Sequence, residues 1–427
     1  NIEACVGADE PVVEAGRGTL NDTAINPNPV NVCFTTPFAT PPAVFSLLGN
    51  EGSDPIALRI DNVTTNGFSV VQVESVGSTA GSTVHTIDFV AIEQGQYQLA
   101  GGIQMEVGAF DITNHQGRRV GGASWFDANF NSAFAAAPAL VTALQTMNNE
   151  TATPPATSST PFLSTAIRSV RSVDFDLALE RAETNIGGVT VAETVAYLAI
   201  DAGERGRLND QFEFESIYSA QNISGSQNGC FGTNFKGFYT TNPLVVGSQA
   251  TRNGGDGGWL RRCSLNTNQI GLMTEEDLDR DGERAHVAER AGLFLLKGTA
   301  VDYTNSCTVN VHHYAISHSE NAVTCEAETV VISAHDVTHA LTAPSNTTTI
   351  TLSTSVAVDG WALKSGNGTF DPVNNQYTFD GIETEVEFWL TKTTPTAPGV
   401  PIDIDVTDGA ATDIDGDATE DKPLVFA

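Results

Sequence analysis

Residues 277–289, DLDRDGERAHVAE, carry acidic side chains at the spacing of a calcium-binding loop. Such a loop opens with D-x-D-x-D-G, in which alternate carboxylates converge on one hard cation and the glycine, here Gly282, permits the turn. Ala288 stands where the loop usually supplies a bidentate glutamate, and Glu289 comes one residue later. The sequence predicts calcium here, with a solvated acidic turn as the alternative. The candidate ligands are the carboxylates of Asp277, Asp279, Asp281 and Glu283.

Two further groups of metal-ligand residue types lie towards the C-terminus. The stretch DIDGD is a second, poorer calcium candidate through Asp413, Asp415 and Asp417. Histidines are concentrated in one segment, at His312, His313, His318, His335 and His339. VHHYAISH is typical of a strand, whose consecutive side chains point to opposite faces, so the adjacent His312 and His313 are not expected to share one ion. We interpret these histidines as structural or surface residues.

The sequence patterns of common catalytic sites are missing from the chain. No G-x-S-x-G, H-E-x-x-H or P-loop pattern occurs, and the glycines of NGGDGGW, residues 253–259, follow no strand-to-helix phosphate signature. A hydrolase has no supporting set of residues, and we expect that the protein is not an enzyme. Trp259 beside these glycines suggests a platform for a sugar ring, but a tryptophan that covers a sandwich core is the favoured interpretation.

Composition limits the partners and the compartment. Asp and Glu number 52 against 20 Lys and Arg, and the net charge of -32 repels phosphate backbones, which makes nucleic acid an unexpected partner. Charged residues make up only 17% of a chain rich in Thr, Asn, Ser, Gly and Val, which is typical of extracellular β-proteins. No apolar run approaches the roughly 20 residues that span a bilayer, so we expect no membrane span in this chain.

The elements that must position these residues form a tandem repeat. RGTLND at 17–22 returns as RGRLND at 205–210, and we take it as the seam between units. CFTTPF at 33–38 is matched by WFDANF at 125–130 and CFGTNF at 230–235, which aligns Cys33 with Trp125 and Cys230.

Two more signatures follow in the same order in every unit. An apolar run comes after proline in PPAVFSLL from Pro41, PALVTAL from Pro138 and PLVVGSQ from Pro243. Each unit closes on a strand-like segment: HTIDFVAIEQG (85–95), ETVAYLAIDAG (193–203) or ERAGLFLLKG (289–298). The intervening FSVVQV and FDLALE alternate as half-buried strands do. We therefore expect antiparallel β-sandwiches in tandem, with the Thr/Pro/Ser-rich insertion at 148–162 as an exposed loop.

The predicted organisation is all-β, with three repeats and an Ig-like sandwich strung as an extended rod. The expected boundaries are 1–16 for the tail of a preceding unit or an N-terminal strand, 17–98, 99–205 and 206–299 for the repeats, and 300–427 for the Ig-like sandwich. Six cysteines without a CxxC pattern indicate disulfides and an oxidising compartment. From their places in the units we predict bonds Cys5–Cys33, Cys230–Cys263 and Cys307–Cys325.

The C-terminal segment carries a family resemblance. HYAISHSENAVTCEAETVVISAHD, TITLST, SGNGTF, IDVTDG and EDKPLVFA fall in order over roughly the last 120 residues and resemble the Ig-like region of MshQ-like surface proteins, which are associated with the mannose-sensitive haemagglutinin pilus of aquatic Gram-negative bacteria. The repeats resemble, more weakly, H-type lectin-like sandwiches with F-x-x-x-F, P-x-V and E-T-V-x-Y-L signatures. The second repeat, with Glu193, Tyr197 and Gly203, matches best, while the third has Leu293 in place of the tyrosine.

This resemblance implies an extracellular protein displayed on the surface or on an appendage of a Gram-negative cell. It carries no ligand-binding residues across, because no set of H-type lectin sugar contacts matches here. We expect an adhesin, with glycans or a host or abiotic surface as partners and calcium as its one suggested cofactor. The alternative is a structural subunit that assembles with copies of itself through strand edges into a filament or sheath.

Overall fold

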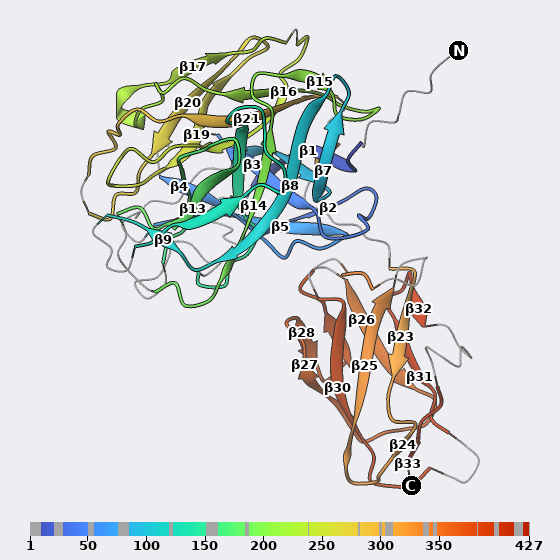
Figure 1. Cartoon of the computed structure of the whole chain (residues 1–427). Coiled ribbons are helices and arrows are strands. Elements are labelled where there is room, and N and C mark those ends of the chain that lie inside the picture. Colours follow the sequence, from blue (N-terminus) through green and yellow to red (C-terminus); the bar gives the residue numbers. More distant parts are fainter. Residues whose placement is uncertain are drawn as a thin grey trace, which may run out of the picture. The chain divides into compact units, whose positions relative to one another are not determined.

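The computed structural model describes residues 10–20, 29–49, 55–75, 85–118, 123–150, 161–183, 188–237, 239–280, 282–298, 301–303, 311–335, 341–344, 348–381, 383–396, 401–413 and 422–426. The chain forms two compact units, Asn1–Asn305 and Ser306–Ala427 (Figure 1). Both are built from β-strands, as the alternating patterns predicted. Among the described residues, no helix is long and apolar enough to cross a membrane.

The first unit contains the same pair of sheets three times. Each repeat combines a four-stranded sheet with a three-stranded one, and the two enclose a core. The four-stranded sheets have the orders β22-β1-β6-β3, β11-β14-β8-β7 and β15-β16-β21-β18, and the three-stranded paths are β2-β5-β4, β10-β13-β12 and β17-β20-β19. All pairs in these paths are antiparallel except β1 with β22.

The strands have the following bounds. In the first repeat they are β1 (Val13–Leu20), β2 (Val30–Cys33), β3 (Ala43–Leu48), β4 (Ile56–Asp61), β5 (Gly67–Glu74) and β6 (His85–Ile92). In the second they are β7 (Gly95–Leu99), β8 (Ile103–Ile112), β9 (His115–Gln116), β10 (Phe126–Asn129), β11 (Ala139–Leu144), β12 (Ser164–Arg168), β13 (Asp174–Glu180) and β14 (Glu193–Ile200). In the third they are β15 (Arg205–Arg207), β16 (Glu213–Tyr218), β17 (Phe231–Asn234), β18 (Leu244–Gln249), β19 (Trp259–Leu265), β20 (Gln269–Glu275) and β21 (Ala291–Lys297), followed by β22 (Val301–Tyr303).

The apolar runs after proline become β3, β11 and β18, and these three strands meet in the middle of the unit. Phe45 belongs to a core cluster to which all three repeats contribute, together with its counterparts Val141 and Val246. The preceding residues on these strands, beginning with Val44, instead belong to the separate cores of the individual repeats. Alternate side chains of one strand therefore serve two cores. The repeats pack around shared apolar residues, and the expected rod is not confirmed.

Close backbone approach between repeats requires glycine at one central position. A Cβ atom on Gly292 of β21 would lie 1.8 Å from the carbonyl oxygen of Leu140 in β11. Only a residue without a side chain lets the third repeat pack this closely on the second.

The edge strands link the repeats in a ring. After the closing strand of the first repeat, β7 pairs with β8 of the second, and after that of the second, β15 pairs with β16 of the third. After the third repeat, β22 returns to the start and pairs with β1, with Gly16 opposite Val301 and Gly18 opposite Tyr303. The chain thus closes the ring with its own backbone.

Two sequence alignments of the repeats are wrong in register. RGTL lies in β1, whereas Arg205–Arg207 forms the edge strand β15, whose counterpart in the second repeat is β7. The structurally matched aromatic pairs are Phe34–Phe38, Phe130–Phe134 and Phe235–Tyr239, with ring centroids 4.8, 5.0 and 5.5 Å apart. In the second and third repeats, aromatic residues occur at every fourth position. The F-x-x-x-F pattern predicted from the sequence therefore lies four residues too early in these two repeats. Cys33 consequently corresponds to Asn129 and Asn234, and not to Cys230.

The second unit is a β-sandwich, as predicted for the Ig-like segment. Its main ladder has the order β27-β30-β25-β23-β32-β31-β26-β29-β28, and β24 pairs with β33. Both halves of the ladder contribute to one apolar core that includes Tyr314, Phe388 and Tyr377. Its strands are β23 (His313–Ser317), β24 (Asn321–Ala322), β25 (Ala327–His335), β26 (Thr349–Thr354), β27 (Gly360–Ser365), β28 (Thr369–Asp371), β29 (Gln376–Thr378), β30 (Glu385–Thr391), β31 (Ile404–Thr407), β32 (Thr412–Asp413) and β33 (Val425–Phe426).

Candidate functional site

Each repeat of the first unit has a buried glutamate that binds the loop after the first strand of its three-stranded sheet. Glu14 accepts hydrogen bonds from the backbone N–H of Thr35 at 2.9 Å and from its hydroxyl at 2.7 Å. Glu106 accepts the N–H of the matching Asn131 at 3.0 Å, and Glu215 binds the corresponding loop of the third repeat in the same way. These three glutamates were not predicted from the sequence. In the first, second and third repeats, respectively, the glutamate lies in a strand 21, 25 and 21 residues before the loop residue that it binds.

A second glutamate holds the loop after the central strand in two repeats. Glu193 accepts hydrogen bonds from the hydroxyl of Thr146 and from the N–H of Asn148 at 3.0 Å. Glu289 accepts the equivalent bonds from the hydroxyl of Thr251 and from the N–H of Asn253 at 2.6 Å. In the first repeat this place is taken by the buried His85.

The contacts between repeats differ from junction to junction. Arg59 of the first repeat forms a doubly hydrogen-bonded ion pair with Glu150 of the second at 2.5 and 2.8 Å, with both side chains buried. Between the second and third repeats, Arg252 pairs with Glu180. Between the third and first, Arg262 pairs with the buried Asp88 at 3.2 Å. Arg261 donates to the carbonyl oxygen of Gly49 at 2.9 Å and pairs with Glu275 of its own repeat at 3.0 Å.

In the predicted calcium segment, Asp277 and Glu283 accept hydrogen bonds from backbone N–H groups. Asp277 is buried, and its carboxylate accepts the N–H of Asp279 at 3.0 Å and the N–H of Glu183 from the second repeat at 2.8 Å. Burial raises the pKa of Asp277 to about 7, against the opposing effect of these hydrogen bonds. Glu283 is exposed and accepts the N–H of Ala285 at 2.9 Å, while Asp281 lies outside the described residues. Among the residues that the structure describes, no group of three or more His, Cys, Asp or Glu is arranged to hold a metal, and calcium stays a prediction.

His286, in the same segment, lies between two carboxylates. Its Nδ1 contacts Glu276, and its Nε2 lies 3.1 Å from Glu289. Burial alone lowers the pKa of His286, but the hydrogen bonds to Glu276 and Glu289 outweigh it and raise the value to about 9. At neutral pH the imidazolium therefore neutralises part of this buried acidic group, and it supports the loop that Glu289 holds.

The other metal candidates lie in the second unit. Asp413 is buried and accepts the N–H of Val406 at 2.8 Å, whereas Asp415 and Asp417 lie outside the described residues. His312 precedes β23, and its Nδ1 lies 3.1 Å from that of His313, so the expected separation of these two side chains is wrong. The alternation of a strand does not apply because His312 is not in it.

The remaining histidines have different surroundings. The ring of His335 packs 5.2 Å from that of His313, with which it is paired across β23 and β25. His318 lies 2.7 Å from the carbonyl oxygen of Lys422, and burial lowers its pKa. His339 lies outside the described residues.

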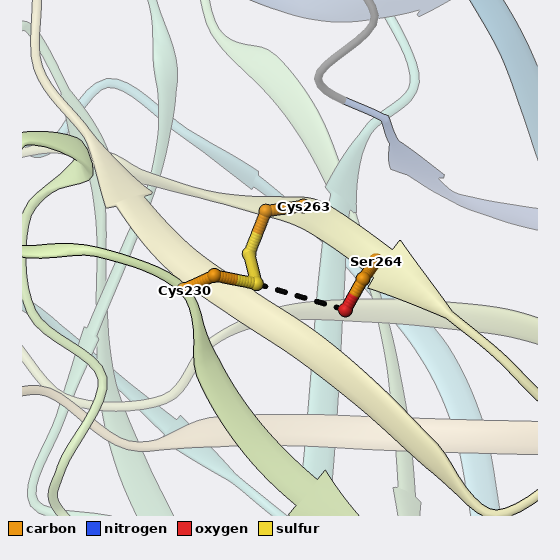
Figure 2. The surroundings of a disulfide bond; sticks show 3 residues. All are labelled: Cys230, Cys263 and Ser264. Atoms are coloured by element: carbon orange, nitrogen blue, oxygen red, sulfur yellow. Dashed lines mark hydrogen bonds between the residues drawn. A yellow bond between two sulfur atoms is a disulfide. The ribbon is translucent and has the colours of Figure 1, made fainter.

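The disulfide Cys230–Cys263 is present as predicted. Cys230 precedes β17 and Cys263 lies in β19, and these two strands flank β20 (Figure 2). The bond crosses over β20 at Gly271, where a Cβ atom would lie 2.3 Å from the sulfur of Cys230. The bond therefore requires a residue without a side chain at position 271.

The other predicted bonds have different outcomes. Cys33 is disulfide-bonded, and its predicted partner Cys5 lies outside the described residues. Cys325 is a free and exposed cysteine, so the predicted bond with Cys307 is not formed; Cys307 itself lies outside the described residues. The disulfide Cys230–Cys263 is compatible with export to an oxidising compartment.

Trp259 is a core residue and not an exposed platform. It is 7% exposed, and its indole N–H donates to the carbonyl oxygen of Ile56 at 2.7 Å, across a junction between repeats. Its ring packs 5.2 Å from that of Phe162 of the second repeat. The glycines before it serve this packing: a Cβ atom on Gly257 would lie 2.6 Å from the carboxylate of Glu180.

A groove of about 590 Å³ lies on the third repeat, over β15, β16 and the end of β21. Its lining combines the cations Arg205, Arg207 and Lys297 with Glu213 and the aromatic side chains of Phe214 and Tyr239. This volume is within the usual range for ligand pockets, about 300–1,000 Å³. The groove therefore concentrates positive charge on a chain in which acidic residues predominate.

The cations of this groove have exposed head groups. Arg205 donates to the carbonyl oxygen of Lys236 at 3.0 Å and forms no ion pair within the described part of the chain. Lys297 pairs with Glu213 at 2.9 Å, and both side chains are about half exposed. Tyr239 lines the groove and donates from its hydroxyl to the buried Glu215 at 3.2 Å, so its ring is held in place. Burial raises the pKa of Tyr239, and the phenol stays neutral.

No family model matches the chain, and no curated protein or solved structure is significantly similar to it. The geometry described above is therefore the basis for a functional assignment.

Proposed function

We propose that this protein is an exported surface adhesin that binds acidic saccharides in the groove on the third repeat. The observation that carries the proposal is the gathering of Arg205, Arg207 and Lys297 around the ring of Tyr239. Guanidinium groups bind carboxylate and sulfate oxygens through paired hydrogen bonds, and an aromatic ring packs against the apolar face of a sugar. Neutral saccharides would offer no charge to Arg205, which forms no ion pair within the described residues.

The overall charge supports selectivity for this place. With a net charge of -32, most of the surface repels an acidic polymer, and the groove is where attraction is expected. Binding at exposed charges is weakened by salt, because the Debye length is about 8 Å at physiological ionic strength. An adhesin of this kind would bind more weakly as salt concentration rises.

The alternative of a filament subunit has less support from the strand edges. Assembly through strand edges needs an open edge, but at the edge beside β1 the strand β22 of the same chain is already paired. That edge needs no second molecule to complete it.

The test is calorimetric titration with a carboxylated oligosaccharide, such as an oligogalacturonate, and with a neutral oligosaccharide of the same length. We expect binding of the acidic ligand only, weakened at least about tenfold by Arg205→Ala or Lys297→Ala, a loss of about 1.4 kcal/mol.

The matched control is Lys422→Ala in the second unit. Lys422 is 46% exposed and pairs with the exposed Glu320 at 2.6 Å, so it resembles Lys297 in exposure and pairing. Equal losses in Lys297→Ala and Lys422→Ala would point to a general charge effect and overturn the groove as the site. Sedimentation over a range of protein concentrations tests the filament alternative, which predicts self-association.

A further inference from the structure

A cavity of about 90 Å³ lies where the three central strands meet. Each repeat contributes the same positions of its central strand and of the neighbouring strand of its small sheet. On the central strands these positions begin with Ser46, Thr142 and Gly247, and on the small sheets they include Ala57, Thr165 and Leu260. The cavity therefore belongs to no single repeat.

The three repeats have diverged at these equivalent positions. The first repeat supplies apolar side chains, among them Leu47, Leu48 and Leu58. The second and third supply hydroxyl and amide groups, chiefly Ser164 and Gln249. The polar groups of the second and third repeats form one part of the lining, the polar wall, beside apolar residues that include Leu144 and Leu260 of the same repeats. A mainly apolar lining with a few polar groups is the usual composition of a small-molecule site.

Part of the polar wall is already hydrogen-bonded within the protein. The hydroxyl of Thr142 lies 2.9 Å from that of Thr165, and the N–H of Thr142 donates to the hydroxyl of Ser248 at 2.9 Å. The first bond lies within the second repeat and the other crosses from the second repeat to the third, and together they fix the wall in place.

Two polar atoms of this wall lack a partner. The hydroxyl of Ser164 and the Oε1 of Gln249 are buried and accept or donate no hydrogen bond within the described residues. The two residues are 8% and 6% exposed. The amide nitrogen of Gln249 donates to the carbonyl oxygen of Thr251 at 2.9 Å, which leaves its oxygen for another donor. A buried polar atom without a partner costs about 1–3 kcal/mol, so an occupant that hydrogen-bonds both atoms is favoured.

Size and charge define this occupant. A protein cavity of about 150 Å³ holds benzene, so a cavity of 90 Å³ has room for about four non-hydrogen atoms. A sugar ring is too large. No charged side chain lines the cavity, so an ion would be buried without a counter-charge, at a high cost in free energy.

We propose that this cavity is a binding site for a small neutral diol or alcohol, whose hydroxyl groups bond to Ser164 and Gln249 and whose carbons pack against the leucines of the first repeat. The site is independent of the basic groove on the third repeat. Since all three repeats line it, an occupant stabilises the whole unit and not one sandwich.

The probe is ethane-1,2-diol, with glycolate as its charged counterpart, added to the full chain purified without polyols and followed by ligand-observed NMR and thermal unfolding. We expect saturable binding of the diol and a rise in Tm with its concentration, and no saturable binding of glycolate. Gln249→Leu and Ser164→Ala should each weaken diol binding at least tenfold.

The matched control is Thr274→Val. The Thr274 hydroxyl is likewise buried without a partner, but it lies outside the cavity. Diol binding should be unchanged in this variant. The proposal is overturned if the wild-type chain shows no saturable diol binding, if both cavity variants bind as it does, or if glycolate binds equally. A crystal structure at saturating diol that shows only ordered water at Ser164 and Gln249 would also overturn it.

Discussion

The two ends of the large sheets in the first unit are stabilised differently. At one end, Glu14, Glu106 and Glu215 each bind a loop of their own repeat with the same geometry. Towards the other end and along the junctions, the repeats are joined by arginine–carboxylate pairs at a different position each time: Arg59–Glu150, Arg252–Glu180 and Arg262–Asp88. The glutamate contacts within a repeat thus recur in all three repeats, whereas the contacts between repeats differ from one junction to the next. Individual buried charges at the junctions favour one order of repeats around the ring, as a buried polar group fixes register in other assemblies.

The strongest test breaks the junction between the first two repeats. Arg59→Met leaves the carboxylate of Glu150 buried without a counter-charge, and we expect a loss of about 3–5 kcal/mol in the free energy of unfolding. Urea denaturation measures it, with Lys422→Met on the surface of the second unit as the control. The double variant with Glu150→Met should recover most of the loss, and a double variant whose losses simply add would contradict a direct ion pair.

The loop contacts within the third repeat should respond to pH through His286. Its pKa is about 9 in the folded chain against 6.5 for the free side chain, so its contribution is complete below about pH 6.5 and is lost as pH rises through 9. The loss is about 3 kcal/mol, since each pKa unit corresponds to about 1.4 kcal/mol. Denaturation of wild type and His286→Gln at pH 6 and pH 10 checks this, because the variant should lack this part of the pH dependence. Equal dependence in both chains would rule it out.

The repeated contacts should give equal effects in equivalent variants. Glu106→Gln and Glu215→Gln each remove a charged acceptor from two loop N–H groups, and we expect about 2 kcal/mol from each. Thermal unfolding measures both, and a single cooperative transition should shift by similar amounts. Very different shifts in Tm would show that these two contacts have similar geometry but contribute different amounts to the free energy of unfolding.

The smallest expected effect concerns calcium. Asp277 faces backbone N–H groups, so any ion at this segment has few protein ligands, and we expect weak calcium binding that Asp279→Ala abolishes. Calorimetric titration with calcium tests this, with magnesium as the reference ion. An absence of heat with the wild-type chain would leave the acidic turn as the better interpretation.

The repetition, the strand content and one of the disulfides could be predicted from the sequence, because each leaves a local pattern. The central strands followed from proline and an apolar run, and Cys230–Cys263 followed from its place within one repeat. The shared core could not be predicted, because Phe45 and Val44 are both apolar and no pattern says which of them faces a neighbouring repeat. Arg59 and Glu150 are 91 residues apart, and a buried ion pair at that separation has no sequence signature.

The return of β22 to β1 determines how the ring would carry mechanical load. The two strands are parallel, so the start of β1 and the end of β22 lie at opposite ends of the pair. Tension applied through the residues before Val13 and through the second unit would therefore slide the strands along each other. In that direction the hydrogen bonds between them bear the force together and do not open one at a time. The pair that closes the ring would act as its clamp against tension.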